Sequence, residues 1–149
     1  MSETTLGKKF DKIESRKIAL LVKGSCIEQV KDLLKELAKA GKLKELEVVL
    51  FYCSKNEEKI QFKDELALLA EKNPKLQIVH VLTSLDEEQK EEWHGEEGFI
   101  DRKMIKRHLD NEQDFFFLIV GTPIFNESLQ KRLEDELAIK PEMIEVENA

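Results

Sequence analysis

Short apolar segments alternate with amphipathic segments along the chain. Largely continuous apolar runs occupy residues 18–22, 46–52, 77–82 and 115–120, and a shorter run follows at residues 143–146. Runs that are apolar throughout, instead of at every second position, are typical of strands covered on both faces of a sheet. Between the runs, apolar residues recur three or four positions apart, which predicts amphipathic helices.

Local signals mark several predicted helix boundaries. Pro74 predicts a helix end just before it, because the residue preceding a proline is pushed out of the helical region. Ser54 and Glu57 have the spacing of a capping box, which predicts that a helix opens there. Thr122 followed by Pro123 predicts an N-cap and the first residue of the last long helix.

Strand and helix alternate five times, which predicts an α/β fold: a Rossmann-like, doubly wound, five-stranded parallel sheet with helices on both faces. A polar, acidic excursion at residues 83–98 lies between the third and fourth strands. We divide the chain into an N-terminal segment, residues 1–15, and one domain, residues 16–149. Ligands of such folds bind beyond the carboxyl ends of the strands, so the loops at residues 22–27 and 120–123 are the candidate site.

Composition narrows the class of protein. The 149 residues carry a net charge of −7, which argues against a nucleic-acid partner because such a partner requires a basic face. No stretch approaches the roughly 20 apolar residues of a membrane-spanning helix, so we expect no direct membrane insertion. With only two cysteines and no visible targeting signal, we expect an intracellular protein, either cytoplasmic or on the mitochondrial matrix side.

Several stretches carry motifs in an order and at spacings that match a known family. Residues 6–10 resemble a G-x-F stretch, residues 93–101 match the pattern W-x-G-x-x-G-F-I, and residues 120–125 correspond to C-G-P-P-x-M. Together they resemble the NAD(P)H-binding domain of the ferredoxin–NADP reductase superfamily, most closely its NADH–cytochrome b5 reductase and nitrate reductase branch. In that family, the stretch like residues 6–10 leaves the flavin domain.

The resemblance implies that NADH or NADPH is held by the two loops. The positions that match the family's binding motifs are Gly24, Ser25, Gly121, Thr122 and Pro123. We assign no catalytic residue and no metal ligand. The R-x-Y-[ST] flavin signature is absent, so we expect no flavin in this chain.

The first loop departs from the family pattern G-G-[ST]-G-I-[AT]-P. Lys23 and Cys26 replace two glycines, which elsewhere allow the backbone to approach the pyrophosphate closely. Glu28 falls in the first helical turn, where its charge would repel phosphates. We therefore expect weak dinucleotide binding, in the high-micromolar to millimolar range, with the alternative that Lys23 compensates as a phosphate partner.

The last loop departs as well. Val120 stands where the family has the cysteine that helps to place the nicotinamide, and Phe125 replaces its methionine. Val120, Pro123, Ile124 and Phe125 lie on or beside the face that a flavin domain would cover. We therefore expect other protein chains to bind this face near Phe125, with the alternative that Phe125 folds back into the core.

Three functions follow from these expectations. The first is a degenerate reductase-type domain, a pseudoenzyme that is an accessory or structural subunit of a larger redox assembly, for example a mitochondrial one in electron transport. The second is the NADH-binding half of a split oxidoreductase of the cytochrome b5 reductase type, with the flavin domain on another chain. The third is a weak nucleotide sensor. In none of them do we expect the chain to be an active enzyme alone.

Other candidate chemistry is sparse. Cys26 at a helix start is either a reactive thiol of lowered pKa or a buried one. His94 and His108 have no partner at metal-ligand spacing, and His80 is a strand residue. Trp93 is interpreted as a packing anchor for the excursion.

Overall fold

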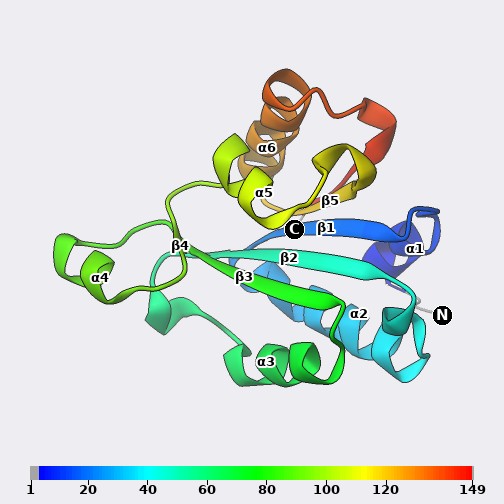
Figure 1. The fold of residues 1–149 in the computed structure, drawn as a ribbon, viewed down its shortest axis with the longest axis horizontal. Helices are drawn as coiled ribbons and strands as arrows, with labels where there is room; N and C mark the ends of the chain where they lie inside the picture. The colour runs from blue at the N-terminus through cyan, green and yellow to red at the C-terminus, as the bar shows by residue number, and fades with distance from the viewer. Residues whose placement is uncertain (1–3, 149) are drawn as a thin grey trace.

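The computed structural model describes residues 4–148. They form a six-stranded parallel sheet in the order β4-β3-β2-β1-β5-β6 (Figure 1). The strands are β1 (Lys17–Lys23), β2 (Glu47–Ser54), β3 (Leu76–Leu82), β4 (Glu96–Glu97), β5 (Phe116–Gly121) and β6 (Ile144–Asn148). The helices are α1 (Thr5–Asp11), α2 (Ile27–Lys39), α3 (Lys63–Lys72), α4 (Glu87–Glu92), α5 (Arg102–His108) and α6 (Pro123–Glu136).

The predicted doubly wound α/β fold is confirmed, but the predicted number of five strands is wrong, since the sheet has six. The additional strand, β4, lies within the polar excursion and pairs with Val81 and Leu82 at the edge of the sheet. It consists of Glu96 and Glu97 alone, so neither its length nor its hydropathy distinguishes it from a loop in the sequence.

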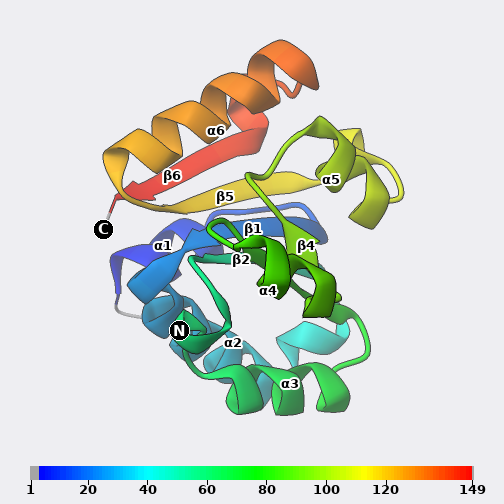
Figure 2. The same cartoon turned by 90° about the vertical axis from the view of Figure 1, so that its left-hand side faces the viewer.

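Alternate side chains of the strands point into two separate hydrophobic cores. Leu20 and Val22 of β1 pack on one face with α1, α2 and α3, whereas Ala19 and Leu21 pack on the other with α5 and α6. Figure 2 shows these two helical layers on opposite sides of the sheet. Strand side chains are fully buried in both cores. Because each central strand is covered on its two faces, both odd and even positions along it are apolar.

The described part of the N-terminal segment is helical. In α1, Leu6 and Phe10 are buried in the first core, and the Thr4 hydroxyl accepts a hydrogen bond from the Gly7 amide at the helix start. The Lys9 ammonium lies 2.8 Å from a carboxylate oxygen of Glu147. Residues 4–11 are therefore packed against the same sheet as the rest of the chain.

The predicted capping box at Ser54 is wrong, whereas the predicted cap at Thr122 is confirmed. Ser54 is the last residue of β2, and Asn56 caps the following short 3₁₀ turn, η3 (Glu57–Lys59), by accepting from the Lys59 amide. Thr122 caps α6, and Pro123 is its first residue. Ser54 is thus free to face the carboxyl edge of the sheet.

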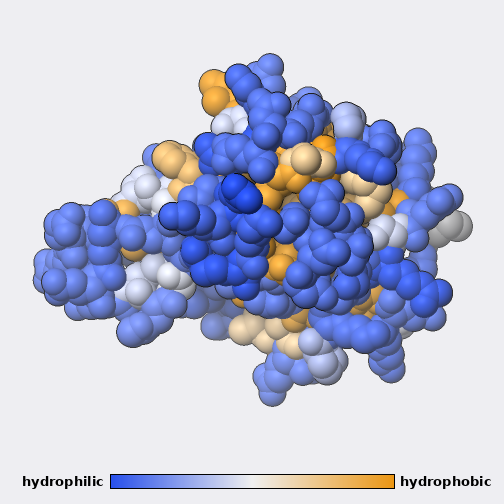
Figure 3. Space-filling model, turned by 45° about the horizontal axis from the view of Figure 1, so that its top comes forward, coloured by the Kyte–Doolittle hydropathy of each residue, from blue (hydrophilic) through white to orange (hydrophobic). Residues whose placement is uncertain are grey.

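The surface is mostly hydrophilic, as expected for a chain with 37% charged residues (Figure 3). Among residues 4–148, the large apolar side chains that are most exposed are Leu68, Phe99 and Ile124. None of the described helices is long and apolar enough to cross a membrane.

Candidate functional site

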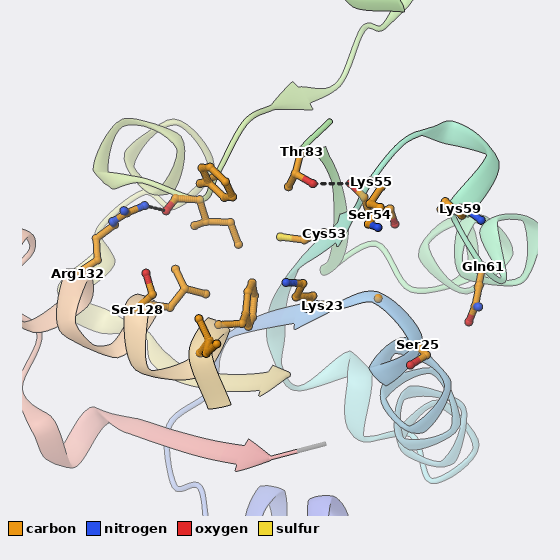
Figure 4. A pocket seen from close by; sticks show the side chains of 16 residues that line it. Lys23, Ser25, Cys53, Ser54, Lys55, Lys59, Gln61, Thr83, Ser128 and Arg132 are labelled. Atoms are coloured by element: carbon orange, nitrogen blue, oxygen red, sulfur yellow. Dashed lines mark hydrogen bonds between the residues drawn. The ribbon is translucent and has the colours of Figure 1, made fainter. Parts of the chain in front are cut away.

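A cavity of about 590 Å³ lies at the carboxyl edge of the sheet. It is bounded by the ends of β1 and β2, by Thr83 after β3, and by the first turns of α6 (Figure 4). The connections from β1 and β5 leave the sheet on opposite faces, because α2 packs in one core and α6 in the other. The cavity therefore lies at the topological switch point, where such folds bind ligands.

The lining of the cavity has one sign of charge. Lys23, Lys55, Lys59 and Arg132 line it, and no aspartate or glutamate is among the described lining residues. The contrast is large because the chain as a whole carries a net charge of −7. A cleft lined by a single sign of charge concentrates ligands of the opposite sign, so this cavity favours an anion.

Lys23 is the cation at the centre of the site. It ends β1, and its ammonium lies 5.7 Å from the centroid of the Phe125 ring. In Figure 4 its side chain lies in the cavity near Cys53. No carboxylate of residues 4–148 lies within ion-pair distance of Lys23, so its charge is available to a ligand.

The first candidate loop contributes Gly24 and Ser25 to the lining. Gly24 has φ +57°, a left-handed conformation that other residues adopt only with strain, while the space around its α-carbon is open. The loop is a 3₁₀ turn, η1 (Gly24–Cys26), that leads into α2, and no side chain caps the start of that helix. No side chain caps η1 either, and the Ile27 amide at the start of α2 donates to the Gly24 and Ser25 carbonyls, so the amides left to water or to a ligand are those of the turn itself.

Three substitutions in this loop were expected to weaken phosphate binding, and the side chains of two of them, Cys26 and Glu28, do not line the cavity. Cys26 is buried in the first core, and burial raises the pKa of its thiol, so it is the buried thiol of the two alternatives. Glu28 is exposed and is absent from the lining. Of the three altered positions, only Lys23 faces the site.

The second candidate loop shapes the site without lining it. Gly121, Thr122 and Pro123 are absent from the lining, although we predicted that all three bind cofactor. A β-carbon on Gly121 would lie 2.5 Å from Cδ2 of Phe125, so glycine is needed for the ring to pack there. Phe125 is half-buried and lines the cavity.

The expectation of an exposed apolar face around Phe125 needs correction. Val120 is fully buried, and Phe125 packs against the second core, as in the alternative of inward folding. The exposed apolar side chains at the rim are Ile124, with 82% of its surface exposed, and Phe99, with 74%. Ile124 precedes Phe125 on α6, and successive residues of an α-helix are rotated by about 100° around its axis, so Ile124 can be exposed while the Phe125 ring packs inward.

The side of the cavity next to β2 was missed by sequence reasoning. Ser54, Lys55, Lys59 and Gln61 line it. The backbone amide of Gln61 donates to the hydroxyl of Tyr52 (2.8 Å), which ties the loop after β2 back to that strand. Their position just after the second strand was the available signal, because that position contributes to binding in dinucleotide folds.

The opposite side is formed by α6 and the segment before α5. Leu129 and Phe125 give it an apolar surface together with Ile100. The guanidinium of Arg132 donates to the carbonyl of Ile100 (2.5 Å), which ties this segment to α6. The Arg132 guanidinium also lies 3.5 Å from the Glu136 carboxylate, so the unpaired cations Lys23, Lys55 and Lys59 face a side that is largely apolar.

The tryptophan motif holds the excursion in place. The Trp93 indole donates to the carbonyl of Glu96 (2.8 Å), and a β-carbon on Gly95 would lie 2.5 Å from the indole ring. Glu96 is bound in turn by Arg107 and His108, each at 2.6 Å, and the Arg107 hydrogen bond is the main reason that the pKa of Glu96 is lowered. The interpretation of Trp93 as a packing anchor is confirmed.

The histidines do not form a metal site in the part of the chain that the structure describes. No three His, Cys, Asp or Glu side chains of residues 4–148 come together to hold a metal ion. His80 is half-buried beside the Tyr52 ring, and burial lowers the pKa of its imidazole.

Cys53 lines the cavity but is 4% exposed, and burial raises the pKa of its thiol to about 12. Only the thiolate is nucleophilic, so we expect a thiol reagent at pH 8 to modify neither Cys53 nor Cys26 at an appreciable rate in the folded protein. In denaturant both thiols react. The measurement is the time course of disulfide-reagent absorbance with and without denaturant, and a rapid modification of one thiol in the folded protein would contradict the assignment.

Comparison with known proteins identifies the family. The family model described as the oxidoreductase NAD-binding domain matches residues 20–131. The chain belongs to this family. The expected resemblance to the pyridine-nucleotide domain of these reductases is thereby confirmed, and the matched range includes the cavity-lining residues from Lys23 to Leu129.

Curated relatives of this NAD-binding domain include NADH-cytochrome b5 reductase 1 of Mortierella alpina, which is 27% identical over 121 residues, 80% of this chain and 39% of the relative. The protein of the same name from Meyerozyma guilliermondii is 30% identical over 86 residues, 56% of this chain and 29% of the relative. The chain therefore spans well under half the length of these relatives.

Solved structures share the fold. The cytochrome b5 reductase domain of Ulva prolifera nitrate reductase superposes with a TM-score of 0.74 at 22% identity, over 91% of this chain and 49% of that one. The CS-b5R domains of human Ncb5or, in the NAD⁺ form, give 0.71 at 23% identity, over 98% and 39%. Ferredoxin-NADP⁺ reductase from Plasmodium falciparum gives 0.64 at 17% identity, over 89% and 52%.

Proposed function

We propose that the chain binds NADH or NADPH in this cavity and is the pyridine-nucleotide domain of a flavin-dependent oxidoreductase, with the flavin held outside residues 4–148. The observation that carries the proposal is the lining, which has four cationic side chains and no carboxylate on a chain of net charge −7. A dinucleotide is an anion with two flat rings, so it matches a cavity with one cationic and one apolar side. The cavity volume, about 590 Å³, is within the range of small-molecule sites.

Each part of the cavity has a role in this proposal. Lys23 and the uncapped turn η1, at the switch point, bind the pyrophosphate. The residues after β2 bind the adenosine end, and Phe125 and Leu129 give the nicotinamide an apolar surface. When bound, the dinucleotide supplies a hydride.

The acceptor of that hydride has to be held close to the donor, at about 3–3.5 Å. The exposed rim formed by Phe99 and Ile124 lies on the apolar side of the cavity. We propose that the flavin-bearing partner, on another domain or chain, docks at this rim. The partner would cover both side chains and exclude water from the nicotinamide.

A second candidate is the degenerate domain, an accessory subunit without reductase activity. It is favoured by the last loop, where the Phe125 ring packs against Gly121 and Val120 is buried in place of the family's cysteine. In this candidate the rim of Phe99 and Ile124 serves only to bind other chains. The two candidates differ in whether the cavity binds a dinucleotide.

Isothermal titration calorimetry of the full chain with NADH and with NADPH tests the proposal. We expect saturable binding of one molecule per chain with a Kd below about 1 mM, corresponding to about −4.1 kcal/mol or better. Adenosine, which lacks phosphates, is the control ligand and should bind much more weakly. If neither dinucleotide saturates the protein at several times that concentration, the proposal is wrong and the accessory-subunit candidate is favoured.

A further inference from the structure

The end of β2 carries the groups that distinguish two kinds of dinucleotide. In dinucleotide-binding α/β folds, an acidic residue near this point binds the 2′-hydroxyl of the adenosine ribose, whereas a cation accommodates a 2′-phosphate. Here β2 ends in Ser54, which is followed by Lys55, and Lys59 follows in the same loop. All three line the cavity, and Figure 4 shows them on the side away from Arg132.

No carboxylate takes the ribose-binding position in the described part of the chain. Glu57 and Glu58 follow Lys55 in sequence, but neither lines the cavity. The Glu57 carboxylate lies 3.7 Å from the ammonium of Lys63, so it is directed to the start of α3. Lys55 and Lys59 have no ion-pair partner among residues 4–148, which leaves two ammonium groups without counter-charge.

Ser54 adds an independent observation. Ser54 is 6% exposed, and its hydroxyl oxygen is buried without a hydrogen-bond partner in the described structure. Its carbonyl, by contrast, accepts from the Thr83 amide (2.9 Å), which fixes the end of β2 next to β3. A buried polar group without a partner is costly, and a ligand oxygen at this end of the cavity would satisfy it.

We propose that the cavity selects a 2′-phosphorylated dinucleotide, NADPH over NADH, through Lys55, Lys59 and the hydroxyl of Ser54. This inference rests on the proposed dinucleotide binding and specifies which dinucleotide is bound. A phosphate monoester adds up to two negative charges and three acceptor oxygens, and it is recognised by lysine ammonium groups together with a hydroxyl donor. A 2′-hydroxyl alone offers Lys55 and Lys59 no charge to bind.

The experiment compares ligands that differ only in the 2′-phosphate. Calorimetric titration of the full chain with 2′-phospho-ADP-ribose and with ADP-ribose, at low ionic strength, isolates this end of the site from the nicotinamide. We expect the phosphorylated ligand to bind at least about tenfold more tightly. A ratio near one, or tighter binding of ADP-ribose, would overturn the proposed selectivity while leaving dinucleotide binding intact.

A double variant assigns the effect to its residues. Lys55→Gln with Lys59→Gln should reduce the ratio to below about threefold and leave the ADP-ribose affinity nearly unchanged. Lys42→Gln with Lys44→Gln is the matched control. These exposed lysines precede β2, at the amino ends of the strands, and their replacement makes the same change in net charge. A ratio that survives in the first variant would overturn the assignment. If neither ligand binds the unmodified chain, the proposed function itself is wrong.

Discussion

Replacement of Phe117 by alanine is expected to lower the free energy of unfolding by about 3–5 kcal/mol. Phe117 lies on β5 and is fully buried in the core between the sheet and the helices α5 and α6. Removing the ring leaves a cavity that the surrounding side chains fill only in part. Urea denaturation followed by circular dichroism measures the change.

Phe99→Ala is the matched control for this prediction. Phe99 is 74% exposed, so the same truncation there should change the free energy of unfolding by no more than about 0.5 kcal/mol. Phe117→Leu, which retains most of the volume, should be less destabilising than Phe117→Ala and remains measurable if the alanine variant does not fold. Equal losses in Phe99→Ala and Phe117→Ala would contradict the arrangement of the core.

The sheet could be predicted from the sequence because its central strands are buried on both faces. The runs at residues 18–22 and 115–120 are apolar throughout, and the parallel fold imposes this composition on them. β4 could not be predicted in the same way. Its two glutamates carry no apolar pattern, and Glu96 is held at the edge by the Trp93 indole of the same excursion and by Arg107 of α5.

The candidate site could be predicted only in part. Gly24 and Ser25 were found because the loop after the first strand has a fixed role in this fold. Ser54 was instead interpreted as a helix cap, because its spacing to Glu57 is a local pattern that matches a capping box. The chain continues in the strand through Ser54, where pairing with Leu82 overrides the local signal.

The effect of a substitution in a binding loop depends on where its side chain lies, which the sequence does not specify. Cys26 was expected to keep the backbone away from the pyrophosphate, and Glu28 was expected to repel phosphates from the first helical turn. In the structure one is buried below the loop and the other is exposed outside the cavity. Of the three altered positions, only Lys23 lines the cavity. Relative to the family pattern, the main change at the binding surface is therefore an added cation.

Lys23→Glu is therefore expected to weaken dinucleotide binding strongly. Hydrogen bonds to charged groups contribute about 1.5–3 kcal/mol, so loss of the ammonium should raise the Kd by roughly 10- to 150-fold. The added carboxylate would also repel the pyrophosphate at the start of α2. The measurement is calorimetric titration of the full chain with NADPH, with the free energy of unfolding determined in parallel.

Two further variants make the Lys23 prediction specific. Lys42→Glu makes the same change in net charge at the opposite edge of the sheet, so it should leave the Kd within about threefold of the original value. Lys23→Gly restores the family's glycine and separates two roles of the lysine. If the ammonium binds phosphate, Lys23→Gly weakens binding. If the long side chain merely obstructs the loop, Lys23→Gly strengthens binding, and that result would contradict the role of Lys23 as the central phosphate partner.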